Sequence, residues 1–155
     1  RIYPSLHFLI PVASPACRSQ IESMLDKQEL NLKLISGRGR EVMKASNAVL
    51  LASGTASLEA MLLRRPMVIA YRMHFLSWMV LSRMVKTPYV GLPNILAGRL
   101  IAPELLQDRA SPENLSRAVS TVLESGGQSQ VSEFDRLADQ IGEGFSKRCT
   151  DALLS

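Results

Sequence analysis

The stretch Ala48–Tyr71, AVLLASGTASLEAMLLRRPMVIAY, determines the fold class that we predict for this chain. It reads as an apolar strand, a sharp turn of small residues, an amphipathic helix, a proline and a second apolar strand, the order of a βαβ unit. The turn Ser53-Gly54-Thr55 would then follow the carboxyl end of a buried parallel strand. The first N–H groups of the next helix lack intrahelical acceptors and favour an anion, most often a phosphate.

Outside this stretch, strand-like and helix-like segments also alternate. Strands are expected at Leu6–Val12, Leu32–Ile35, Ala48–Ala52, Met67–Tyr71 and Tyr89–Leu92, and helices at Pro15–Gln28, Arg40–Ala45, Thr55–Arg64, Pro112–Glu124 and Gln128–Phe145, with a short helix opening in Pro103–Gln107. The strands are apolar without a period of two, which is typical of a parallel sheet covered on both faces. We therefore predict an α/β fold: a Rossmann-like parallel sheet with helices on both faces. Residues 1–125 would form this Rossmann-like domain, with its first strand missing, and residues 126–155 a carboxyl-terminal helical segment.

Composition narrows the class of function. With 155 residues and 46% hydrophobic residues, the chain is long and apolar enough to form a globular domain. Its net charge of +4 suits phosphate-bearing ligands or an anionic membrane surface. Aromatic residues make up only 5% and do not alternate with basic ones, so we expect no nucleic-acid partner. His7 and His74 give no metal-ligand spacing, and Cys17 and Cys149 form no motif. No apolar run reaches the ~20 residues that span a bilayer.

The chain opens on Arg1-Ile2-Tyr3 without a methionine, which resembles the last turn of a helix. We expect it to be the carboxyl-terminal piece of a longer protein. It contains neither a G-x-S-x-G elbow nor a P-loop, and no acid–base pair has a convincing context.

Two candidate features lie within the opening stretch. Gly54 would let the backbone approach a ligand closely, and Ser53 and Thr55 would add hydroxyl donors to the free N–H groups. The alternative is that Thr55 only caps the helix. Glu59 follows one turn later on the same face, either as a ribose ligand or as an early-helix acid that complements the dipole. The spacing of four from Thr55 does not fit a capping box.

Three further candidates lie elsewhere. Gly37-Arg38-Gly39 begins like a GxGxxG fingerprint, but Val42 replaces the third glycine, so a dinucleotide site is not expected; the segment would border a base or form a plain tight turn. Asn94 follows an expected strand and would hold a phosphate or a sugar hydroxyl, or serve as a turn asparagine. The apolar segment Phe75–Val85 around Trp78 is flanked by cations and would lie in a membrane interface, or pack in a core or a dimer.

Two blocks, LLASGTASLEAMLLRRPMVIAYRM and VKTPYVGLPNILAGRLIAPELLQ, resemble the carboxyl-terminal half of lipid-A-disaccharide synthases. The resemblance runs from about Tyr3 to about Leu153. The SGT…Glu…Pro pattern is more distantly similar to the nucleotide-binding half of other GT-B glycosyltransferases, such as the peptidoglycan enzyme that adds N-acetylglucosamine.

The resemblance implies a metal-independent, inverting hexosyltransferase without a cofactor. It would transfer 2,3-diacylglucosamine from UDP to 2,3-diacylglucosamine 1-phosphate, at the cytoplasmic face of the inner membrane of a Gram-negative bacterium. The general base would lie in an amino-terminal domain, and the protein would form a swapped homodimer. Donor binding would fall to Ser53, Gly54, Thr55, Glu59 and Asn94, with Gly37 and Gly39 bordering uracil. Two rival classes stay open, namely a non-catalytic nucleotide-binding regulator and another GT-B enzyme such as a UDP-sugar epimerase.

Overall fold

A computed structural model describes residues 5–25, 31–52, 54–73 and 88–154, with side chains up to residue 142. The chain divides into two compact units, Arg1–Ser46 and Asn47–Ser155, which are described separately. The first unit contains β1 (Phe8–Val12), α1 (Pro15–Met24), β2 (Leu32–Ser36) and α2 (Gly39–Ala45). The second contains β3 (Val49–Leu51), α3 (Thr55–Leu62), β4 (Met67–Tyr71), α5 (Leu92–Ala97), β5 (Glu104–Leu106), the 3-10 turn η1 (Gln107–Arg109), α6 (Pro112–Glu124) and α7 (Gln128–Leu154).

The first unit is a parallel strand pair with two helices. β1 and β2 run in register from Phe8 opposite Leu32 to Val12 opposite Ser36, and α1 and α2 both pack against β1. α1 begins as the sequence predicts, because the Ser14 hydroxyl accepts a hydrogen bond from the Cys17 N–H (3.2 Å) and proline occupies the first turn.

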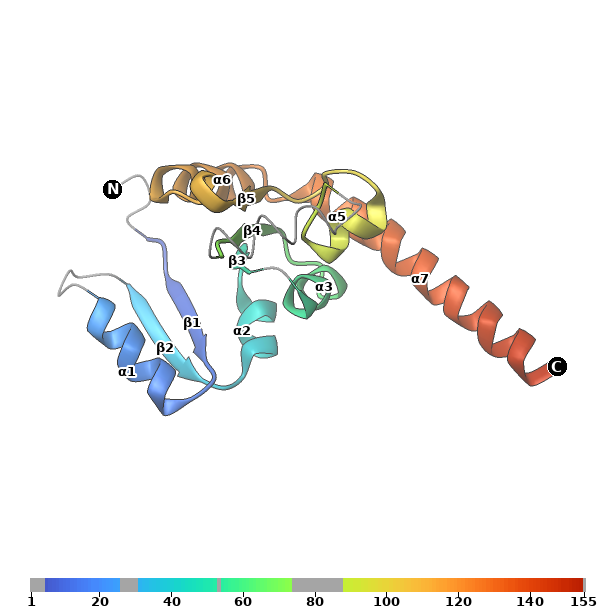
Figure 1. The fold of residues 1–155 in the computed structure, drawn as a ribbon, viewed down its shortest axis with the longest axis horizontal. Helices are drawn as coiled ribbons and strands as arrows, with labels where there is room; N and C mark the ends of the chain where they lie inside the picture. The colour runs from blue at the N-terminus through green and yellow to red at the C-terminus, as the bar shows by residue number, and fades with distance from the viewer. Residues whose placement is uncertain (1–4, 26–30, 53, 74–87, 155) are drawn as a thin grey trace. The chain divides into compact units, whose positions relative to one another are not determined.

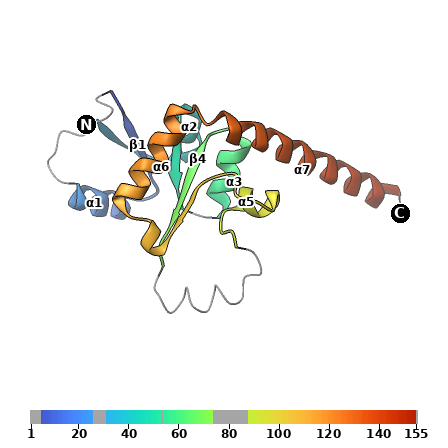
Figure 2. The same ribbon diagram turned by 90° about the horizontal axis from the view of Figure 1, so that it is seen from above.

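The second unit contains a three-stranded parallel sheet in the order β3-β4-β5. In both views the sheet lies between α6 on one side and α3 on the other (Figure 1 and Figure 2). Val68, Leu105 and Val122 form the buried cluster between the sheet and α6. The prediction of an α/β fold with a parallel sheet and helices on both faces is therefore confirmed.

The first half of α7 is fixed to this sheet unit. Gln130 is buried, and its side-chain carbonyl accepts a hydrogen bond from the Met67 N–H at the start of β4 (2.9 Å). Phe134 is fully buried. Burial of a phenylalanine side chain contributes about 1.5–3 kcal/mol, so this ring is an apolar anchor of the helix.

Charged side chains add a second set of contacts between α7 and its neighbours. Arg64, after α3, forms an ion pair with Asp135. Glu133 binds Arg99 (2.6 Å) and Arg136 (3.2 Å). Partial desolvation raises the pKa of Glu133, but hydrogen bonds from these two arginines outweigh it and hold the pKa below its usual value. These pairs are solvent-exposed, so they orient α7 more than they stabilise it.

Two expected elements are wrong. Residues Tyr89–Leu92 do not form a strand, because the N–H groups of Val90 and Gly91 donate to the Glu104 carboxylate instead of a strand ladder. The short helix expected to open in Pro103–Gln107 is replaced by strand β5, and α5 starts at Leu92 with a proline in its first turn. Pro103-Glu104 looks like a helix start in sequence, but the Glu104 side chain is used by this buried contact.

Two predicted features lie outside the described residues, namely Ser53 and the Phe75–Val85 segment with Trp78. Within the described ranges, none of the helices combines the length and the apolar character that crossing a membrane requires.

Candidate functional site

The turn between β3 and α3 depends on a glycine. Gly54 is the N-cap of α3 and has φ 107° and ψ −156°, a backbone conformation that disfavours any side chain. Gly54 and Thr55 are both exposed to solvent. Because Gly54 is the N-cap and Thr55 is already the first helical residue, the alternative that Thr55 serves as the cap is wrong.

The start of α3 presents free backbone donors. Within the part of the chain that the structure describes, the N–H groups of Thr55 and Ala56 have no hydrogen-bond acceptor. They are the first N–H groups of the helix, where the positive end of the helix dipole lies. The turn can therefore receive an anion without first breaking a protein hydrogen bond.

Glu59 lies one helical turn after Thr55 and is half-buried. Residues four apart share one face of a helix. Among the described residues, no hydrogen bond or ion pair involves the Glu59 carboxylate. An acid with unused acceptor capacity beside free N–H groups is suited to bind neighbouring hydroxyl groups of a ligand.

Asn94 has a different environment from the one expected. It lies inside α5, is fully buried, and uses its whole amide within the protein. Its nitrogen donates to the Ala102 carbonyl (2.8 Å) and to Glu104 Oε1 (2.7 Å), and its oxygen accepts the N–H groups of Ile101 (2.8 Å) and Ala102 (2.9 Å). An amide has two donors and two acceptor lone pairs. All four are occupied, so in this arrangement Asn94 has none left for a ligand.

Sequence reasoning gave no role to Ser57, which is fully buried beside the turn. Its hydroxyl donates to the Gly54 carbonyl (2.7 Å) and accepts the Leu92 N–H (3.3 Å). Its position in the sequence indicates this role only weakly, because a serine in the first turn of a helix is also common on a solvent-exposed face.

Gln107 was also missed, at the carboxyl edge of the same sheet. It follows β5 in a left-handed backbone conformation (φ 51°). Its side-chain amide accepts the Met73 N–H (2.8 Å) and donates to the Met73 carbonyl (3.1 Å), which fixes the chain just beyond β4. Ligands of parallel α/β sheets bind at this edge.

The candidate glycines of the first unit form a tight turn. Gly37 has φ 63° and donates its N–H to the Val12 carbonyl (2.8 Å), and Gly39 is the first residue of α2. Arg38 between them has φ 54°, a conformation uncommon for a residue with a side chain. The two glycines therefore belong to a tight turn between β2 and α2.

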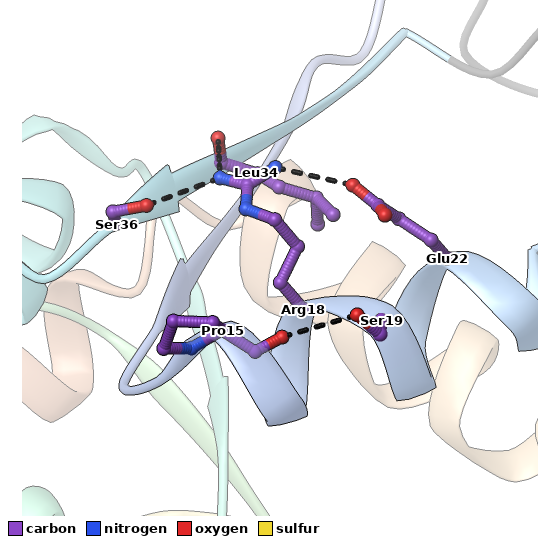
Figure 3. A network of polar contacts seen from close by, with 6 residues as sticks. All are labelled: Pro15, Arg18, Ser19, Glu22, Leu34 and Ser36. Carbon is purple, nitrogen blue, oxygen red and sulfur yellow. Dashed lines mark hydrogen bonds and ion pairs between the residues drawn. The ribbon is translucent and has the colours of Figure 1, made fainter.

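Arg18 supports this turn from α1 (Figure 3). Its guanidinium donates to the Leu34 carbonyl and to the Ser36 hydroxyl, each at 3.2 Å, and to Glu22 on its own helix, also at 3.2 Å. The side chain thus holds the carboxyl end of β2, where the turn begins.

No group of three or more histidine, cysteine, aspartate or glutamate side chains gathers around a possible metal position in the described ranges. The donors at the Gly54 turn are N–H groups, which suit an anion rather than a cation.

Comparison with known proteins gives a consistent answer over nearly the whole chain. The family model described as lipid-A-disaccharide synthetase matches residues 1–152. The chain is 48% identical over 152 residues to a lipid-A-disaccharide synthase of Pseudomonas syringae pv. tomato, a match that covers 98% of this chain and 40% of the relative. It is 48% identical to the Pseudomonas aeruginosa protein of that name, over 97% of this chain and 40% of the relative. The Pseudomonas entomophila protein is 45% identical over 99% of this chain and 41% of its own length.

The chain thus spans about two fifths of the length of the curated relatives that it matches. The resemblance seen in the SGT…Glu block and the GLPN…ELLQ block extends across both compact units. The chain belongs to the lipid-A-disaccharide synthetase family.

Proposed function

We propose that these residues form the UDP-sugar-binding half of a glycosyltransferase in lipopolysaccharide biosynthesis. The enzyme would transfer 2,3-diacylglucosamine from UDP to 2,3-diacylglucosamine 1-phosphate and release UDP and lipid A disaccharide 1-phosphate. The observation that supports this best is the coincidence of family membership with a glycine turn, free N–H groups and an unused carboxylate at one helix start.

Each group in this helix start has a proposed task. The N–H groups of Thr55 and Ala56 bind the donor diphosphate, and Glu59 accepts hydrogen bonds from the ribose hydroxyls. Charge that develops on the departing UDP is stabilised by these fixed N–H dipoles, which would replace a metal ion. Inversion at the sugar carbon requires a base on the opposite side of the sugar, and we assign this base to an amino-terminal domain.

The proposed substrates also suggest where the enzyme acts. Both carry acyl chains, so the protein would work as a peripheral protein at the cytoplasmic face of the inner membrane. Its further partners would be the amino-terminal domain and a second copy of the chain in a swapped dimer. The net charge of +4 favours an anionic lipid surface.

The proposed function predicts nucleotide selectivity without a metal. The protein is expected to bind UDP more tightly than ADP, and EDTA is expected to leave its UDP affinity unchanged, because N–H groups and a carboxylate form the site. Calorimetric titrations with both nucleotides, with and without EDTA, measure this. Equal affinities for UDP and ADP, or loss of binding on chelation, would contradict the proposal.

Replacing Glu59 with alanine should weaken UDP binding by about 10- to 100-fold, the effect of losing hydrogen bonds to a charged group, about 1.5–3 kcal/mol. Uridine should lose as much affinity as UDP, because the lost contacts are to the ribose. Calorimetry with both ligands provides the comparison. Asp139→Ala is the control, since it removes an exposed carboxylate of α7 and should leave both affinities unchanged. An unchanged UDP affinity in a folded Glu59→Ala variant would show that Glu59 does not bind the ligand and only complements the helix dipole.

A further inference from the structure

The buried hydroxyl of Ser57 joins the start of α3 to the start of α5. It donates to the Gly54 carbonyl (2.7 Å) and accepts the N–H of Leu92, the first residue of α5 (3.3 Å). Ser57 has no exposed surface. Water therefore cannot easily replace either bond, and one oxygen atom connects the two helix starts.

The bond to Gly54 orients the peptide unit that carries the first free N–H of α3. This unit contains the Gly54 carbonyl and the Thr55 N–H, which point in opposite directions because the peptide is planar and trans. Glycine leaves the backbone unusually free to rotate at this point. The same carbonyl also accepts the Ser57 N–H (3.1 Å), so Ser57 holds it with both its backbone and its hydroxyl. These bonds together set the direction in which the Thr55 N–H points.

The partner of Ser57 is itself held by a buried carboxylate. Glu104 Oε2 accepts the Val90 N–H (2.9 Å) and Oε1 accepts the Gly91 N–H (2.8 Å), directly before Leu92. An ideal Cβ at Gly91 would lie 2.2 Å from Ile69 Cδ1 and 3.1 Å from Glu104 Oε1. A side chain at residue 91 would therefore require the Ile69 side chain to move and would crowd the carboxylate.

We propose that Ser57 and Glu104 are positioning residues for the donor diphosphate. Glu104 fixes Val90 and Gly91, these residues present the Leu92 N–H to Ser57, and Ser57 holds the Gly54–Thr55 peptide with its N–H directed at the anion. The inference rests on the proposed function, because it assumes that the start of α3 binds the diphosphate. These contacts would explain why the turn keeps one backbone geometry although Gly54 is conformationally free.

The test is a comparison of UDP with uridine in the Ser57→Ala protein. Loss of the Ser57 hydroxyl should lower UDP affinity about 3- to 10-fold, the effect of one neutral hydrogen bond, while uridine affinity should stay within about twofold, because the ribose contact at Glu59 is intact. A merely structural role for Ser57 would weaken both ligands alike or neither.

Two further variants sharpen the comparison. Glu104→Gln should give the same split between UDP and uridine, because an amide nitrogen at the Oε2 position would face the Val90 N–H donor to donor. Ser132→Ala is the matched control: its hydroxyl donates to the Gln128 carbonyl on the exposed side of α7 (3.0 Å), and its loss should change neither affinity.

Titration with inorganic pyrophosphate, followed by the amide NMR signals of Thr55 and Ala56, distinguishes failure of this inference from failure of the proposed function. If the unaltered protein does not bind UDP, the proposed function fails, but a pyrophosphate response that Ser57→Ala weakens would still support the inference. Equal losses for UDP and uridine, an unchanged UDP affinity in Ser57→Ala, or no response of these two amides to pyrophosphate would each overturn it.

Discussion

Replacing Asn94 with alanine is expected to lower the free energy of unfolding by about 3–5 kcal/mol. The change removes four hydrogen bonds at a side chain with no exposed surface. It takes the hydrogen-bond partner from the Ile101 N–H and from the Ala102 N–H and carbonyl, and it removes one of three donors to the Glu104 carboxylate. Each buried polar group left unpaired costs about 1–3 kcal/mol, and more when the group is charged. Urea unfolding followed by circular dichroism measures the loss.

Asn114→Ala is the matched control for this prediction. The Asn114 amide makes one exposed side-chain hydrogen bond, to the Arg109 carbonyl (3.1 Å), so its loss should cost about 1 kcal/mol or less. If Asn94→Ala left stability unchanged and lowered only UDP-sugar affinity, Asn94 would be a ligand contact, as the sequence first led us to expect. Faster hydrogen exchange at the Ala102 N–H in Asn94→Ala would link the stability loss to this network.

The sequence predicts the parts of the fold that local patterns determine. Met67–Tyr71 matches β4 at both ends, and Ser111-Pro112 marks the start of α6, where the Ser111 hydroxyl caps the helix by accepting the Asn114 N–H (3.3 Å). Apolar strands, capping serines and prolines carry this information within a few residues of the element itself.

The segment from Tyr89 to Leu106 could not be predicted in the same way. Its conformation depends on contacts of Glu104 with residues 10 to 14 positions away. An acid in a strand normally indicates an exposed edge or a loop. Here the carboxylate is buried because it accepts three hydrogen bonds, a feature that no local pattern reveals.

In the candidate site, too, local patterns predict some features, while others depend on contacts between distant residues. The free N–H groups at Thr55 and the position of Glu59 follow from a strand–turn–helix pattern, and the structure places both as expected on α3. The roles of Ser57 and Gln107 depend on which backbone atoms come near them from other elements, namely Leu92 and Met73. Local sequence thus identifies the groups that we propose to bind the donor better than the groups that hold the turn in shape.

The prediction with the largest effect concerns turnover. A protein limited to residues 1–155 is expected to form no detectable lipid A disaccharide, even where it binds UDP. The groups that we assign to it, the Gly54–Thr55 turn and Glu59, act on the donor only, and the chain spans 40% of the length of its relatives. Positioning both reactants lowers the activation barrier of a two-substrate reaction by about 7–11 kcal/mol, and a general base adds a further 10²- to 10⁴-fold in rate.

A disaccharide-formation assay with both lipid substrates tests this prediction, with the complete Pseudomonas aeruginosa relative as the active control. Adding the separately produced amino-terminal part of that relative should restore some turnover if the two parts dock. Robust turnover by residues 1–155 alone would show that these residues contain a base, and the division of tasks between donor and acceptor sides proposed above would be wrong.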